Sequence, residues 1–224
     1  MRRAALLLLA ALTGGCLQTT YRNADRSGEP PSMLERRVTY RLAAAFWSTA
    51  PDCAAVLAPG PAPHSVTGAV EQAVERHLAL RMNRVIGGPR VRQAEARLAL
   101  DLRNAGDRGL FARRLDCDSV LEIRLREVSD DYAVLWARRA IGLTLALRRA
   151  RDGELLWTAT HTASRSDGGL PLSILSLPVS AARAAAVTGD GELFASIADD
   201  AVRRMVMTLP DTRGAVLSRR SGTN

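Results

Sequence analysis

The chain has 224 residues, of which 47% are hydrophobic and 24% charged, as expected for a globular protein with its own core. Its net charge of +8 would suit nucleic acid, but the 31 basic residues are all arginines scattered among acidic ones, and only 4% of residues are aromatic. Because so few aromatic side chains cannot build a stacking surface for bases, we expect no nucleic-acid partner.

The chain begins with the three-part pattern of an export signal. Arg2 and Arg3 precede an apolar run over residues 4–12, and three small residues lead from that run to Cys16. The run is too short to span a bilayer, which takes about 20 residues in a helix. We therefore expect residues 1–15 to be removed as a signal peptide.

The end of this segment resembles the lipobox of bacterial lipoproteins, except that Thr13 stands where an aliphatic residue is usual. The resemblance implies that Cys16 is diacylated and becomes the acylated amino terminus; an ordinary signal peptide is the alternative. Several acyl chains would hold the protein firmly on a membrane. Leu17 stands where an Asp would resemble the inner-membrane retention signal, which favours the periplasmic face of the outer membrane.

Residues 16–31 are polar, contain Gly and paired Pro, and have no periodicity, which predicts a flexible tether. A single domain is expected over residues 32–210, followed by a disordered tail over 211–224. At the start of the domain, a capping box and apolar residues three and four apart predict a helix over 33–48. A strand through Val38, Tyr40 and Leu42 competes with it, because these residues also alternate.

The next elements alternate between strand and helix. Residues 54–58 read as a buried strand, and Ser65 or Thr67 can cap a helix that reaches Met82. The Gly-Gly-Pro sequence at 87–89 predicts a firm helix stop. The remaining predictions here are a short basic strand at 90–92 and helices over 94–104 and 109–115.

The second half changes its period to that of strands. Residues 120–128, 132–147 and 155–162 predict three strands, with Asp152-Gly153 as a hairpin turn before the third. A closing amphipathic helix is expected over 193–209. The fold class is therefore α+β: a mixed sheet with helices packed on it, ending in a three-stranded antiparallel meander and a helix.

Two cysteines remain after Cys16. Cys53 and Cys117 begin apolar, strand-like runs, CAAVLAP and CDSVLEIRL. An even pair is a disulfide candidate in an oxidising compartment, provided that the two runs are neighbouring strands. Two buried free thiols are the alternative.

The order of elements resembles a group of bacterial envelope lipoproteins whose small α/β domain is similar to the amino-terminal domain of the Tol propeller protein and to the curli secretion lipoprotein. The CDSVLEIRL strand and the RDGELLW turn, residues 151–157, carry this resemblance over about residues 50–210. The chain also resembles a lipoprotein family first noticed as meningococcal surface antigens. It departs from the group where its first strand ends in Ala58-Pro59-Gly60 instead of Pro-Phe.

Residues that could carry catalysis or hold a metal do not form a known motif. His64, His77 and His161 are far apart in sequence, and HExxH, CxxC and GxSxG are all missing from the chain. His77 falls on an apolar helix face, which favours a structural role. We expect no enzyme, no metal site and no cofactor; a catalytic group assembled in space is the competing hypothesis.

One apolar segment stands out as a candidate partner surface. Residues 170–179, LPLSILSLPV, contain two prolines that disfavour a regular element, and Leu172, Ile174 and Leu177 are very apolar for a loop. Burial of this segment over one end of the sheet is the alternative.

These features lead to a functional hypothesis. We expect a membrane-anchored periplasmic lipoprotein that scaffolds or regulates a cell-envelope complex of unknown identity, and that could form a homo-oligomer. From another class, the alternative is an auxiliary lipoprotein of an ABC-type lipid or solute transport system.

Overall fold

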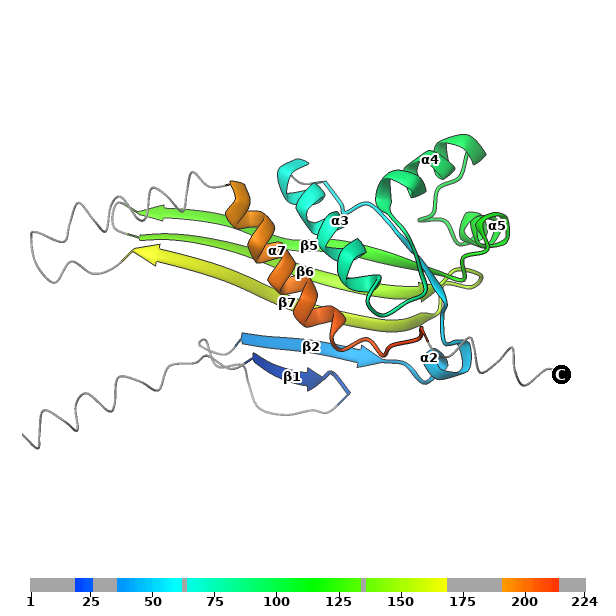
Figure 1. Cartoon of the computed structure of the whole chain (residues 1–224), viewed down its shortest axis with the longest axis horizontal. Helices are drawn as coiled ribbons and strands as arrows, with labels where there is room; N and C mark the ends of the chain where they lie inside the picture. Colours follow the sequence, from blue (N-terminus) through cyan, green and yellow to red (C-terminus); the bar gives the residue numbers. More distant parts are fainter. Residues whose placement is uncertain (1–18, 26–35, 62–63, 134–135, 169–190, 214–224) are drawn as a thin grey trace, which may run out of the picture.

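A computed structural model describes residues 19–25, 36–61, 64–133, 136–168 and 191–213. They form a seven-stranded mixed sheet with helices packed on it, so the predicted α+β class is confirmed (Figure 1). The strand order is β1-β2-β7-β6-β5-β3-β4. The strands are β1 (Thr19–Asn23), β2 (Arg36–Leu42), β3 (Cys53–Val56), β4 (Arg84–Ile86), β5 (Ser119–Ala133), β6 (Trp136–Arg149) and β7 (Leu155–Gly168). The helices are α2 (Ala44–Thr49), α3 (His64–Leu78), α4 (Gly88–Leu98), α5 (Ala105–Leu115) and α7 (Gly191–Val206).

The predicted meander forms the centre of the sheet. Strands β5, β6 and β7 pair antiparallel over nearly their whole length. The turn between β6 and β7 falls at the predicted Asp152-Gly153 pair, and Gly153 has a φ of 75°, a conformation that glycine adopts without steric cost. Trp157, two residues into β7, is fully buried and donates its indole N–H to the Thr208 hydroxyl at 3.0 Å.

The first half of the domain supplies the parallel part of the sheet. Strand β3 pairs in parallel with β4 on one side and with β5 on the other. The connection from β3 to β4 contains α3, and the connection from β4 to β5 contains α4 and α5. This is the arrangement that early strands separated by helices predict.

The two faces of the sheet are covered unequally. Helices α3 and α7 lie side by side on one face and enclose the main core, which contains alternate residues of β6 such as Leu143 and Leu145 (Figure 1). On the other face, α4 and α5 pack against the β3 end of the sheet around a smaller cluster that includes Phe111 and Val120. The rest of that face is not covered by any described helix.

The expected helix over residues 33–48 is wrong, and the competing strand is right. Residues Arg36–Leu42 form β2, and a short helix, α2, follows only from Ala44. Strand β2 pairs antiparallel with β7, with Val38 opposite His161. The apolar residues fit both periods, so the pairing with β7 decides the conformation.

The expected tether and tail need correction where they meet the domain. Thr19–Asn23, predicted to be flexible, form β1 at the edge of the sheet in parallel with β2. Near the other end, Thr212 is buried although it lies in the predicted tail, and its hydroxyl donates to the Pro51 carbonyl at 2.8 Å. The domain is therefore fixed closer to both ends of the chain than expected.

The Gly-Gly-Pro sequence at 87–89 begins a helix instead of ending one. Strand β4 precedes it, α4 starts at Gly88, and the strand predicted at 90–92 lies inside α4. The backbone N–H of Gly88 donates to the Glu75 carboxylate of α3 at 2.8 Å. A Cβ on Gly87 would lie 2.5 Å from that carboxylate and would displace it, so glycine leaves room for this contact. The start of α4 is thus capped by another element.

Candidate functional site

Several predicted site residues lie outside the described residues. These are Cys16, the expected lipidation site, and Leu172, Ile174 and Leu177, the candidate partner surface. Their roles stay predictions. Within the described residues, no helix is long and apolar enough to cross a membrane.

The two cysteines predicted as a disulfide candidate come together at one end of the sheet. Strands β3 and β5 are neighbours, so Cys53, the first residue of β3, and Cys117, two residues before β5, lie at a Cα–Cα distance of 5.0 Å, and the structure joins them in a disulfide. Both cysteines are buried. Ser119 reinforces the junction, because its buried hydroxyl donates to the Cys53 carbonyl at 2.6 Å.

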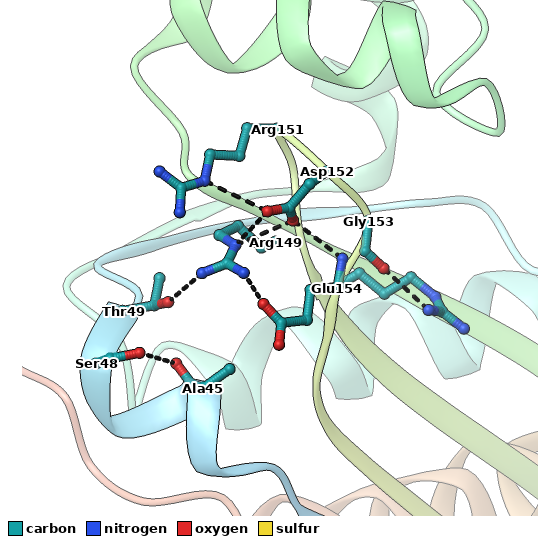
Figure 2. Close-up of polar contacts among 9 residues, drawn as sticks. Ala45, Ser48, Thr49, Arg149, Arg151, Asp152, Gly153 and Glu154 are labelled. Atoms are coloured by element: carbon teal, nitrogen blue, oxygen red, sulfur yellow. Dashed lines mark hydrogen bonds and ion pairs between the residues drawn. The ribbon is translucent and has the colours of Figure 1, made fainter.

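Beside the disulfide, Arg149 organises the β6–β7 turn (Figure 2). Its Nε donates to both carboxylate oxygens of Asp152 at 3.0 Å, and its guanidinium also pairs with Glu154. Its Nη1 donates to the Thr49 hydroxyl at the end of α2, also at 3.0 Å. The hydrogen bonds from Arg149 help to lower the pKa of Asp152. One arginine therefore ties the hairpin turn to α2.

A pocket of about 380 Å³, with several charged residues in its lining, opens between this turn, α5 and the disulfide. Burial raises the pKa of Asp118, although the backbone N–H groups of Cys53 and Asp52 donate to its carboxylate at 3.2 and 3.3 Å and partly offset the effect. The pocket is lined by Thr49, Gly109, Ala112, Arg113, Asp116, Cys117, Asp118, Arg149 and Arg151. Its cysteine is held in the disulfide and it has no histidine, so its chemistry is that of a charged binding surface.

A second, basic groove lies at the β4 edge of the sheet. It has a volume of about 470 Å³ and is lined by Arg84, Val85, Ile86, Arg90, Gln93, Ala94, Arg97, Leu98 and Leu115. Arg84 donates to the carbonyls of Leu115 and Asp116 and so caps the end of α5. The lining combines three arginines with aliphatic side chains and contains no acidic residue, which suits an anionic, partly apolar group.

The histidines do not meet at one site. His77 lies 2.8 Å from Asp199 through its Nε2 and thereby connects α3 with α7. His161 is buried in β7, with its Nδ1 2.7 Å from the Arg37 carbonyl of β2. His64 is exposed at the start of α3. In the described ranges, no group of His, Cys, Asp and Glu could hold a metal ion.

The uncovered face of the sheet is polar. Its central row runs across β2, β7, β6 and β5 through Thr39, Thr160, Thr144 and Arg124. The hydroxyls of Thr144 and Thr160 lie 3.1 Å apart. Next to this row, Glu122 pairs with Arg148 at 3.2 Å. The face offers hydroxyl groups and charged side chains, among which arginines outnumber acidic residues.

The sequence indicates the disulfide candidate, but neither the uncovered sheet face nor the Arg149 cluster was predicted from it. The alternation in β6 and β7 showed which residues would be buried, so the opposite residues could have been placed on one surface. The Arg149 cluster had no comparable signal, because Thr49 is 100 residues away in sequence.

No protein-family model and no curated protein matches the chain. Among solved structures, it is similar to a point variant of the PelC dodecamer from Paraburkholderia phytofirmans, with a TM-score of 0.42, 16% identity, and 69% of this chain and 85% of that one covered. Lipoprotein GNA1162 from Neisseria meningitidis gives a TM-score of 0.44 and 18% identity, covering 59% of this chain and 95% of that one. A minor lipoprotein from Acinetobacter baumannii gives 0.34 and 9%, covering 70% and 91%.

Bacterial lipoproteins are thus among the proteins to which this chain is structurally similar. The finer resemblance to the Tol propeller protein and the curli lipoprotein stays a prediction.

Proposed function

We propose that the protein is an exported lipoprotein, lipidated on Cys16, which acts without catalysis as a scaffold or regulator of a cell-envelope complex at the periplasmic face of the outer membrane. The disulfide is the observation that supports export most directly. Disulfides persist in oxidising compartments such as the periplasm and are rare in the cytosol. The Cys53–Cys117 pairing therefore agrees with the export signal that ends at Cys16.

The start of β1 limits how far the domain can lie from a lipid on Cys16. Thr19 is only three residues after Cys16. An extended chain spans at most about 3.6 Å per residue, so lipid on Cys16 would hold the first strand within about 11 Å of the anchored residue. The proposed scaffold would work next to its membrane.

The uncovered sheet face gives the scaffold a surface. The described residues of this face, including Thr144, Thr158 and Thr160, present hydroxyl groups on rigid, paired strands. Non-obligate protein interfaces are about as polar as the rest of a protein surface and contain direct hydrogen bonds, so a polar face can serve as one. We propose this face as the contact surface for the envelope partner.

Replacement of Cys16 by alanine tests the anchor. The wild-type protein should fractionate with membranes, and its mass should exceed that of the cleaved chain by the lipid groups. Cys16→Ala should lose both the added mass and the membrane association. The double variant Cys53→Ala/Cys117→Ala is the matched control and should stay lipidated. A Cys16→Ala protein that remains in the membrane fraction with unchanged mass would contradict the proposal.

The groove at β4 supports the alternative, an auxiliary lipoprotein of an ABC-type lipid or solute transport system. Its three arginines and aliphatic lining fit an anionic amphiphile. Cross-linking in intact envelopes and analysis of co-purified lipid separate the two candidates. An adduct with an envelope protein through the open face supports the scaffold. A bound anionic lipid that is lost in Arg90→Glu/Arg97→Glu supports transport.

A further inference from the structure

The basic groove at β4 lies along an open edge of the sheet. Strand β4 is the last in the strand order, and β3 is its only partner among the described strands. The backbone N–H of Arg84 donates to the carbonyl of Asp52, just before β3, at 3.2 Å. Because successive residues of a strand direct their peptide groups to opposite sides, the N–H and C=O of Val85 face away from β3. Such an edge can accept a further strand.

Helix α4 forms the other wall of this groove. It begins at Gly88, two residues after Ile86 ends β4. Ile86 from the strand and Ala94 and Leu98 from the helix line the space between the two elements, and Leu98 is 39% exposed. An extended peptide binds to an open sheet edge through its main chain and places alternate side chains in flanking pockets. The groove offers both the edge and an aliphatic wall for those side chains.

Two arginines of α4 indicate the charge of the occupant. Arg90 and Arg97 both line the groove, and within the described part of the chain neither side chain forms an ion pair or a hydrogen bond. By contrast, Arg92 of the same helix pairs with Glu71 at 2.9 Å. The lining of the groove contains no acidic residue. Carboxylates of a bound segment would therefore give Arg90 and Arg97 the partners that Arg92 already has.

The spacing of these arginines fits an extended segment. Arg90 and Arg97 are seven residues apart, which is about two turns, so they lie on one side of α4 about 10 Å apart along its axis. Acidic residues two positions apart on one face of a strand are separated by about 7 Å. The long arginine side chains can adjust to this difference, so each arginine can meet one carboxylate.

The chain's own C-terminal residues do not fit this groove by charge. Thr212 lies beside Arg81, three residues before β4, to whose carbonyl its backbone N–H donates at 2.8 Å. Residues 214–224 follow, and they contain two arginines and no acidic side chain. A basic segment is repelled by a basic groove, so an acidic segment of another protein is the better occupant.

We infer that this groove binds an extended, acidic segment of an envelope protein, which adds to β4 as a further strand and places its carboxylates against Arg90 and Arg97. The inference rests on the proposed scaffold function, because it names the kind of partner segment that the scaffold would hold. It does not depend on lipid on Cys16.

Peptide binding tests the inference. The mature chain, with its disulfide intact, is titrated into a fluorescein-labelled peptide in which Val and Glu alternate, and the fluorescence anisotropy is measured. The matched peptide carries Lys in place of each Glu. We expect the Glu peptide to bind at least about ten-fold more tightly, because the lining of the groove carries only positive charges. Equal binding of the two peptides overturns the inference.

Two double variants locate the charge contact. Arg90→Glu/Arg97→Glu should weaken binding of the Glu peptide by about ten-fold or more. Arg103→Glu/Arg126→Glu, at two exposed positions outside the groove, makes the same change in net charge and should alter binding by less than about two-fold. Unchanged thermal melting shows that both variants fold. Binding that survives in the first variant, or falls equally in both, contradicts the assignment.

Val85→Pro tests the strand addition itself. Proline removes the N–H that faces away from β3 and is tolerated at such edge positions, so binding should weaken while the pairing with β3 remains. A Glu peptide with methylated amide nitrogens makes the same test on the wild-type chain, should the variant not fold. Undiminished binding of the methylated peptide overturns the inference, as does binding of phosphatidylglycerol in place of the Glu peptide. Neither measurement involves Cys16, so a failure here is distinct from a failure of the proposed lipidation.

Discussion

The two faces of the sheet are stabilised by different means. The face under α3 and α7 has a continuous apolar core that reaches from β2 to β3. The face under α4 and α5 has a small cluster in which a disulfide takes part, surrounded by arginine contacts such as those of Arg108 with the carbonyls of Leu102 and Arg103. The comparison suggests that hydrophobic burial stabilises the first face, whereas a covalent link compensates for limited burial on the second.

The largest effect is expected from truncating the main core. Trp157 is fully buried, and Trp157→Ala removes both its ring contacts and its hydrogen bond to Thr208. We expect the free energy of unfolding to fall by about 4 kcal/mol, measured by urea denaturation. Trp47→Ala, at an exposed position, is the control and should change it by less than about 0.5 kcal/mol. Equal losses in the two variants would contradict the proposed core.

Removal of the disulfide should have a somewhat smaller and more local effect. The bond closes a loop of 64 residues that contains α3, β4, α4 and α5. Cys53→Ala/Cys117→Ala should lower the free energy of unfolding by about 3 kcal/mol, because the unfolded chain gains conformational freedom. Hydrogen exchange should show the larger loss of protection in α4 and α5, and the smaller one in α7. An equal loss of hydrogen-exchange protection in the helices of both faces would show that the disulfide does not stabilise one face more than the other.

The smallest expected effect is on the pH dependence of stability. The pKa of a carboxyl group is shifted in opposite directions on the two faces. Burial raises the pKa of Asp118, near the disulfide, above 3.8. In Asp200 of α7, burial opposes ionisation, but hydrogen bonds from Arg204 and Arg203 outweigh it and lower the pKa below 3.8. Carboxyl chemical shifts measured against pH should therefore show Asp118 gaining its proton at higher pH than Asp200. The reverse order would contradict both assignments.

Because each of these carboxyl groups has a different pKa in the folded and unfolded states, the free energy of unfolding depends on pH. The contribution of Asp200 is present above its unfolded pKa and is lost as pH falls from about 3.8 through the lower folded value. Ionised Asp118 has the opposite effect, because stability falls as pH rises from about 3.8 through its raised folded value. Comparison of Asp118→Asn and Asp200→Asn with the wild type in urea, at several pH values, should give slopes of opposite sign.

The sequence predicts the second half of the fold better than the first. Strands β5 to β7 follow from strict alternation, and the turn from Asp152-Gly153, since these signals are local and agree with one another. The alternation also marks the buried side of β6, where Leu143 and Leu145 belong to the main core. The disulfide could be named as a candidate because both cysteines begin apolar runs, but only the pairing of β3 with β5 decides it.

The errors occur where a distant element determines local structure. Strand β1 is short and polar, so only its pairing with β2 reveals it. The sequence Gly87-Gly88 looks like a helix stop, because the carboxylate that caps α4 belongs to Glu75. The Arg149 cluster depends on Thr49, which a local pattern cannot indicate. Interactions across such separations are decided by tertiary packing.

The position of the disulfide also bears on the order in which the sheet assembles. Cys53 begins β3 and Cys117 lies two residues before the neighbouring parallel strand β5, and the two cysteines are 64 residues apart in sequence. Parallel pairing over such a distance is slow, because the loop must close before any contact forms. Once the two sulfurs are bonded, the starts of β3 and β5 are held together, and the pairing of these strands becomes a local event. Oxidation in the compartment where the chain folds therefore acts kinetically, by converting the longest connection in the parallel half of the sheet into a short one.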